Sequence, residues 1–133
     1  MDYVLKTIRT TVLKCDTPTI TDRVYPLDLV KKSIKNDRVL QEKLATHSFF
    51  GEVHFDEVKE VDLSKAAFNV DKLYWYKNEL RAKIDILDTY YGRALLGFLK
   101  GGRFTTYGRG SMDANKRITE FNLCNIYFTS ANY

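Results

Sequence analysis

The sequence predicts an α+β fold, in which two or three helices pack on a mostly antiparallel β-sheet or barrel. The clearest observation is a hairpin pattern in residues 72–87, where apolar residues alternate with charged ones: Leu80, Ala82, Ile84 and Ile86. A second observation is the helical spacing of apolar residues that follows Thr89. A third is the length of 133 residues with 44% hydrophobic content, which suits one core. We therefore expect a single domain over residues 1–133.

The first part of the chain predicts one strand and two helices. Residues 3–14 are rich in β-branched residues and should form a strand, and residues 16–23 form a polar loop. Pro26 suits the first turn of a helix. The expected buried positions of this helix are Leu27, Val30 and Ile34. A second helix should run to about Ala45, after a break at Asn36-Asp37, with three apolar positions: Val39, Leu40 and Leu44.

The middle of the chain predicts strands. Residues 49–55 should form a short strand in which Gly51 marks a bulge or a close backbone approach. Residues 58–63 and 66–70 also have strand character. We expect the strands at 72–77 and 80–87 to be joined across Asn78-Glu79.

The last part of the chain predicts a helix and two strands. Thr89 can cap a helix over residues 90–100. Its expected buried stripe consists of Tyr91, Ala94, Leu95, Phe98 and Leu99. Gly101 is placed for a left-handed residue after the helix, followed by a strand at 103–107. A turn is expected at Gly108-Arg109-Gly110, since glycines bracket the arginine. Residues 118–129 should be the final strand, with four core residues: Phe121, Leu123, Ile126 and Phe128.

The charge pattern gives only a mild basic bias. The net charge is +4, and basic and acidic residues are interspersed. One local patch could form from Arg103, Arg109, Lys116 and Arg117. This falls short of the clustered basic stripe of nucleic-acid-binding proteins, so nucleic acid is not an expected partner. The many aromatic residues in predicted strands are attributed to cross-strand packing rather than base stacking.

Other signals exclude several classes of protein. No apolar run is long enough to span a membrane, and the N-terminal residues lack the apolar region of a signal peptide, so synthesis in the cytoplasm is expected. Without an export signal, Cys15 and Cys124 are expected to be free thiols. His47 and His54 have no metal-ligand spacing around them, so neither a metal nor a cofactor is expected.

The order of short motifs resembles that of the prohead (capsid maturation) proteases of tailed phages, which share a fold with the herpesvirus assemblin proteases. Residues 21–26 (TDRVYP) resemble the family's N-x-R-x-Y-P segment, and residues 50–54 (FGEVH) resemble its G-E-x-x-H-P strand. Residues 86–102 resemble the family's strand followed by a glycine-containing helix. Residues 107–110 (YGRG) lie where the family has S-S-R-G, and 121–130 resemble its last strand.

The sequence departs from this family at the catalytic positions. The resemblance implies a serine just before Arg109, activated by a histidine, yet Tyr107 and Gly108 stand there. The family spacing places the histidine at Phe55, one residue after His54, and a shift of one residue in a strand reverses the face. The nearby hydroxyls are offset by one to three residues: Thr105, Thr106 and Ser111.

The resemblance therefore implies two hypotheses. The first is a non-enzymatic phage head protein, acting in the virion as an auxiliary, decoration or internal capsid component. It would contact the major capsid protein, other head proteins or further copies of itself, with four candidate contact residues: Tyr107, Arg109, Lys116 and Arg117. The second is an active serine- or threonine-type maturation protease that cleaves capsid or scaffold proteins, with His54 as base and a displaced nucleophile at Thr106 or Ser111. A nucleic-acid-binding β domain is a third, weaker alternative.

Overall fold

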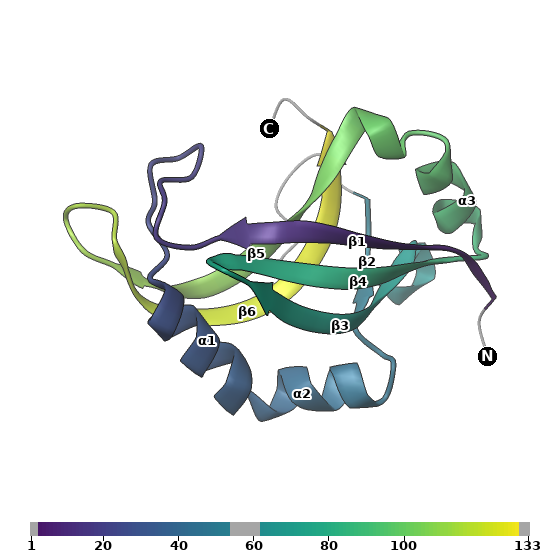
Figure 1. Cartoon of the computed structure of the whole chain (residues 1–133). Helices are drawn as coiled ribbons and strands as arrows, with labels where there is room; N and C mark the ends of the chain where they lie inside the picture. The colour runs from purple at the N-terminus through teal and green to yellow at the C-terminus, as the bar shows by residue number, and fades with distance from the viewer. Residues whose placement is uncertain (1–2, 54–61, 131–133) are drawn as a thin grey trace.

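Two antiparallel sheets form a half-barrel in the computed structural model, which describes residues 3–53 and 62–130. The larger sheet has the order β1 (Val4–Lys14), β4 (Glu79–Leu87), β3 (Phe68–Tyr76) and β2 (Phe50–Gly51). The second sheet is a ribbon of β5 (Gly102–Met112) and β6 (Ile118–Ser130), which curves behind the larger sheet in Figure 1. The predicted α+β fold with a mostly antiparallel sheet is confirmed.

The β3–β4 hairpin is confirmed as the centre of the larger sheet. In β4, Leu80, Ala82, Ile84 and Ile86 are all fully buried, while the residues between them are half-buried. The turn is Lys77-Asn78, one residue earlier than expected, and Lys77 has a positive φ of 53°. The expected strands at 66–70 and 72–77 form one strand that is interrupted by a bulge between Val70 and Lys72.

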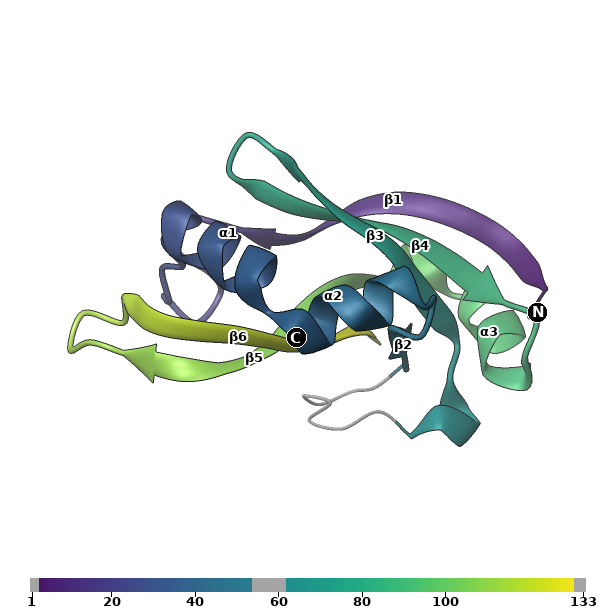
Figure 2. The same cartoon turned by 90° about the horizontal axis from the view of Figure 1, so that it is seen from below.

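The helices α1 (Leu27–Asn36) and α2 (Arg38–Ala45) lie along one side of the half-barrel, as seen from below in Figure 2. The predicted break is confirmed, because Asp37 ends α1 and its carboxylate accepts the Leu40 N–H at 3.1 Å as the cap of α2. Of the three apolar positions of α2, Leu40 is buried, Leu44 is half-buried and Val39 is 64% exposed. This short helix buries Leu40, and the adjacent position turns toward solvent.

The helix α3 (Tyr90–Leu96) is shorter than predicted, and the chain continues as a separate 3₁₀ turn, η2 (Leu99–Gly101). The Thr89 hydroxyl caps α3 by accepting the Gly92 N–H at 2.9 Å, as predicted. Leu95 is fully buried, but the rest of the predicted stripe is not: Tyr91, Ala94 and Phe98 are exposed and Leu99 is partly buried. The helical period ends after Leu96, so later residues leave the stripe. Among the described glycines none has a positive φ, so the left-handed Gly101 is also wrong.

Within residues 49–53, the strand predicted at 49–55 consists of β2 and a parallel bridge from Val53 to Phe128, and residues 54–55 lie outside the described residues. The close approach predicted at Gly51 is confirmed, because a Cβ there would lie 2.2 Å from the Phe68 ring and 2.6 Å from the Ile126 carbonyl oxygen. The strand predicted at 58–63 lies largely outside the described residues. Its last residue belongs to a 3₁₀ helix, η1 (Leu63–Lys65).

The turn predicted at Gly108-Arg109-Gly110 is wrong, because β5 continues through these residues and pairs with β6 as far as Met112 and Ile118. The hairpin turns at residues 113–117, where the Asp113 carboxylate accepts the Asn115 N–H at 2.8 Å and the Arg117 N–H at 3.1 Å. Glycines permit a turn, but here they are accommodated in a strand with a bulge after Tyr107.

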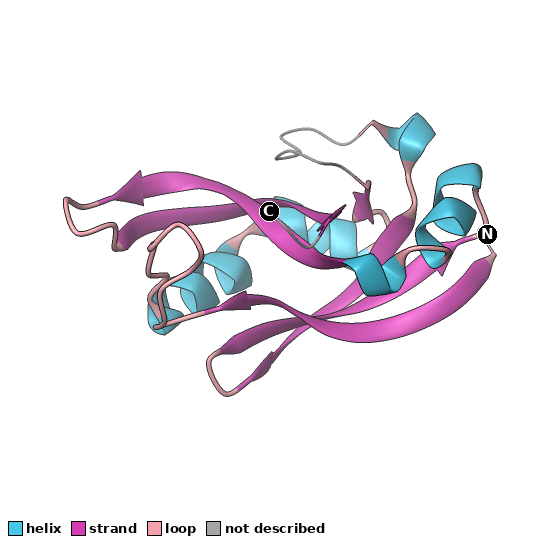
Figure 3. Cartoon of the chain, turned by 90° about the horizontal axis from the view of Figure 1, so that it is seen from above, coloured by secondary structure: helices cyan, strands magenta, loops and turns pink. Residues whose placement is uncertain are grey.

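One apolar core fills the space between the two sheets and the helices, which Figure 3 shows by their type. The Phe104 ring of β5 lies between Phe68 of β3 and Phe128 of β6, with ring centroids 5.0 Å apart in both pairs. Both cysteines are free thiols, as expected, with Cys15 buried and Cys124 half-buried. This core fixes the ribbon on the sheet and therefore fixes the residues of the candidate site.

Candidate functional site

Strand β5 carries the predicted hydroxyls and the residues that stand in the nucleophile positions. Thr105 pairs with Tyr127 of β6 and Thr106 with Ile126, so the two threonines face opposite sides of the ribbon. Tyr107 pairs with Asn125 on the Thr105 side. The bulge then shifts the register, and Gly108 pairs with Leu123. The side chains of residues 105–107 thus alternate between the two faces of the ribbon, and the bulge after Tyr107 interrupts this alternation.

A cleft of about 410 Å³ opens along the free edge of β5. Its walls are the end of β1, the loop over residues 17–23 and β5, and its lining includes Thr105, Thr106, Tyr107 and Gly108. Both threonines are half-buried. The cleft therefore brings the predicted hydroxyl of Thr106 to a solvent-accessible hollow beside the positions where the family has its serine.

The position directly before Arg109 has no room for a side chain. A Cβ built on Gly108 would lie 2.3 Å from Cε1 of Phe121 and 3.0 Å from the Asn122 carbonyl oxygen. The Phe121 ring is itself held by an edge-on contact with Tyr25, with centroids 5.5 Å apart. An aromatic ring thus occupies the space that a serine side chain would need.

The candidate base His54 lies outside the described residues. Its neighbour Val53 bridges Phe128, and Phe128 in turn pairs with Phe104 of β5. Thr106 follows Phe104 by two residues in β5, so it lies about 7 Å along the ribbon from the Phe104–Phe128 pair. Ser111 pairs with Glu120, which is eight residues, or about 26 Å, from Phe128 in β6. The structure therefore does not bring Ser111 near Val53, and it places Thr106 closer.

Glu52, the acidic residue of the G-E-x-x-H resemblance, is buried and connects neighbouring elements in this structure. Its side chain is 5% exposed, and its carboxylate accepts the Asp62 N–H at 2.8 Å. Its carbonyl oxygen accepts the Phe128 N–H at 2.9 Å. The Asp62 carboxylate accepts hydrogen bonds from Ser64, which hold the pKa of Asp62 below its usual range. Glu52 thereby joins β2, β6 and the start of η1.

A set of polar residues that was not predicted from the sequence lies on the Thr105 side of the ribbon. On β6, Asn125, Tyr127 and Thr129 are nearly or completely buried, and the Thr129 hydroxyl has no hydrogen-bond partner among the described residues. On β5, Arg103 and Thr105 pair with Thr129 and Tyr127. The alternation of these polar residues with the core residues of β6 is the signal in the sequence that could have predicted this second face.

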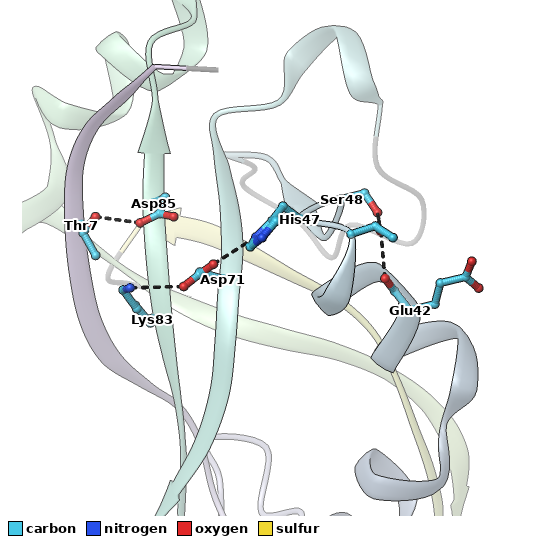
Figure 4. Close-up of polar contacts among 8 residues, drawn as sticks. Thr7, Glu42, His47, Ser48, Asp71, Lys83 and Asp85 are labelled. Atoms are coloured by element: carbon cyan, nitrogen blue, oxygen red, sulfur yellow. Dashed lines mark hydrogen bonds and ion pairs between the residues drawn. The ribbon is translucent and has the colours of Figure 1, made fainter. Parts of the chain in front are cut away.

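The remaining histidine lies elsewhere, on the outer surface of the larger sheet. His47 Nδ1 is 3.2 Å from the Asp71 carboxylate, which also pairs with Lys83 Nζ at 3.2 Å, and both contacts are drawn in Figure 4. The neighbouring Ser48 hydroxyl is hydrogen-bonded to Thr46 at 2.7 Å. These side chains have the residue types of a catalytic triad, but the serine is directed to Thr46.

Arg109 projects from β5 with an exposed side chain and no hydrogen bond or ion pair within the described part of the chain. It lines a hollow of about 630 Å³ beside α2 and a smaller one of about 140 Å³ that Arg23 also lines. Lys116 and Arg117 are exposed at the hairpin turn, where Arg117 bridges Val24. Tyr107 is half-buried in the cleft of β5.

Residues 3–53 and 62–130 contain neither a metal-binding cluster nor a membrane-spanning helix. No group of three His, Cys, Asp or Glu side chains is arranged there to hold a metal ion. No helix in these ranges is long and apolar enough to cross a bilayer.

The half-barrel is the fold of a phage capsid protease. The solved structure of the bacteriophage T4 capsid assembly protease gp21 superposes with a TM-score of 0.80 at 20% identity, over 92% of this chain and 80% of that one. The description "prohead core protein serine protease" fits residues 6–126, and the chain therefore belongs to this family. Among curated proteins none matches. The predicted resemblance is thus confirmed.

Proposed function

We propose that this chain is a non-enzymatic member of the prohead protease family, which acts in the phage head through protein–protein contacts as an auxiliary, decoration or internal capsid component. The observation that carries this proposal is the packing of Gly108 against Phe121. A serine at this position would overlap the ring, and Tyr107 cannot replace a nucleophilic hydroxyl activated by histidine. Loss of the nucleophile leaves the fold without its chemistry.

Arg109 supports a role in contacts. A guanidinium makes paired hydrogen bonds with carboxylates, and arginine and tyrosine are enriched at interface hot spots. Arg109 is exposed and unpaired within the described residues, with Tyr107 two positions away. We infer that acidic side chains of the major capsid protein or another head protein pair with Arg109, with Lys116 and Arg117 at the edge of the contact. The alternative partner for the same surface is a second copy of this chain.

The second candidate is an active protease that uses Thr106, and its supporting observation is the position of Thr106 in the cleft of β5. A working nucleophile needs a base within about 2.6–3.2 Å in the reacting complex. Purified protein should be incubated with capsid and scaffold proteins and with a fluorophosphonate probe. We expect neither cleavage nor labelling. Cleavage that is lost in Thr106→Val, with folding intact, would establish the protease instead.

The contact role is tested with Arg109→Ala. The melting temperature should be unchanged, because the Arg109 side chain has no partner within the described residues. Incorporation into heads should fall, because the contact with the partner is lost. Arg93→Ala is the matched control, since its exposed pair with Asp88 at 2.6 Å should contribute little. Normal incorporation of Arg109→Ala would refute this contact.

Mass spectrometry of purified virions tests the location. The proposal requires the intact chain at a copy number comparable to a capsid component. A chain that is absent from virions, or present only as fragments, would contradict a structural role in the mature head.

A further inference from the structure

The β3–β4 hairpin presents tyrosines and basic residues on the outer face of the larger sheet, away from the β5–β6 ribbon. Tyr74 and Tyr76 share this face, because side chains two residues apart in a strand point the same way, about 7 Å apart. The cross-strand neighbours of Tyr74 are Arg81 and then Thr11, and those of Tyr76 are Glu79 and then Lys14. The hairpin end projects from the body in Figure 2.

Each tyrosine is accompanied by a cation. The Arg9 guanidinium carbon lies 5.7 Å from the centre of the Tyr74 ring, and Lys77 Nζ lies 5.5 Å from the centre of the Tyr76 ring. Such contacts at exposed sites are favourable and hold the cation close to the ring. Hydrogen bonding by Arg81 also lowers the pKa of Tyr74. The basic side chains are thus ordered before any partner arrives.

The charge of this surface is strongly one-sided. We define the tyrosine strip as Tyr74 and Tyr76 with four basic side chains and one acidic one around them: Arg9, Lys14, Lys77, Arg81 and Glu79. The Glu79 carboxylate is engaged by the Thr11 hydroxyl and lies 3.7 Å from Arg81. Arg9, Lys14 and Lys77 are exposed and have no acidic partner within the described residues. A polyanion is therefore the partner whose charge complements the strip.

The aromatic residues narrow the class of polyanion. Tyr76 is 54% exposed, so much of its ring is open to solvent. Proteins that bind single strands combine a basic surface along the phosphates with aromatic rings on which bases stack. An acidic protein would pair with the cations but has no need of stacking rings at regular spacing.

We propose that the tyrosine strip binds single-stranded nucleic acid, with bases stacking on Tyr76 and the Arg9 guanidinium, and with Lys14, Lys77 and Arg81 contacting phosphates. The composition alone did not suggest this, because these side chains are far apart in the sequence and come together only through the pairing of β1, β4 and β3. The surface does not include Arg109, and of its residues only Lys14 also lines the cleft of β5, so it does not depend on the proposed contact in the head.

The test measures fluorescence anisotropy of a labelled 12-nucleotide oligo(dT) at several salt concentrations. Tyr76→Ala should weaken binding by about 5-fold or more, since stacking of one base contributes about 1–3 kcal/mol. The double variant Lys14→Ala/Lys77→Ala should make the slope of log K against log salt shallower by about 1.4, as expected for two lost phosphate contacts on a single strand. Both variants replace exposed residues, so folding should be retained.

Matched controls come from the opposite end of the molecule. Tyr90→Ala removes a tyrosine that is 76% exposed on α3, and Lys65→Ala/Lys100→Ala removes two exposed lysines, so these variants should bind as the unmodified chain does. Absence of oligo(dT) binding at low salt would overturn the proposal. Equal weakening of binding by Tyr90→Ala and Tyr76→Ala would also overturn it. The same holds if poly-glutamate competes fully with oligo(dT) and its binding is insensitive to Tyr76→Ala.

Discussion

At the scale of single residues, the proposed loss of protease chemistry depends on Gly108. Gly108→Ser should not create a protease. It should destabilise the fold by about 1–3 kcal/mol, the usual cost of forcing extra atoms into a packed site, because its Cβ would lie 2.3 Å from the Phe121 ring. Urea denaturation measures the loss of stability, and a fluorophosphonate probe measures any reactive hydroxyl.

Gly101→Ser is the control for that variant, since a Cβ on Gly101 would meet no atom within 4 Å. It should unfold at nearly the same urea concentration as the unmodified chain. A Gly108→Ser variant that is equally stable and reacts with the probe would show that the Phe121 ring moves aside, and the proposed loss of function would then be wrong.

Cys15 gives a prediction about pH. Burial, followed by the nearby Asp16 carboxylate, raises the pKa of Cys15 from 9.0 to about 12. The folded state thus favours the neutral thiol, so its contribution to stability is complete below pH 9.0 and is lost as pH rises toward 12. Urea midpoints between pH 8 and 11 should fall less steeply for Cys15→Ala than for Cys124→Ala. Equal slopes in the two variants would contradict this assignment.

At the scale of elements, α3 has one fully buried apolar side chain rather than a continuous buried stripe. Leu95 is fully buried against the core, whereas Ala94 and Tyr91 are exposed. Leu95→Ala should therefore destabilise the fold by about 2–5 kcal/mol, as for other buried leucines, and chemical denaturation measures this. Val39→Ala on α2 is the control, because that side chain is 64% exposed. Comparable losses in both variants would show that α3 is not anchored in this way.

The elements that could be predicted from sequence are those whose signal is local. The alternation in residues 80–87 predicted β4 because each buried side chain follows a period of two. Residues 108–110 were assigned to a turn because glycines permit one, but their partners in β6 lie beyond the hairpin, and a window of neighbouring residues does not contain that pairing. The end of α3 at Leu96 was missed for a similar reason, since Phe98 and Leu99 continue the apolar period after the helix has ended.

The candidate site could be predicted only as a location. Motif order placed it near Arg109, and the family match bears out that resemblance. The overlap of Gly108 with Phe121 and the position of Thr106 at a cleft depend on the register between β5 and β6. The tyrosine strip depends on three strands. Such features follow from tertiary pairing, and charge counts along the chain do not report them.

At the scale of the whole molecule, one core joins both sheets and the helices, so the chain should unfold as one domain. Trp75 is the only tryptophan in the sequence and packs against that core at its edge. The fluorescence of Trp75 and far-UV circular dichroism should therefore give coincident urea transitions. Two separated transitions would show that the β5–β6 ribbon unfolds independently and that the single-domain prediction is wrong.

The pairing of β1 with β4 also determines when the protein can fold during translation. Their contacts run from Lys14 with Glu79 to Val4 with Leu87, so β1 is synthesised well before the strand with which it pairs. Ribosomes add about 5–20 residues per second, which leaves β1 unpaired for several seconds. Its sequence VLKTIRTTVLK is rich in β-branched residues but carries three basic side chains and no acidic one. Repulsion between these charges on neighbouring nascent chains opposes their aggregation during that delay.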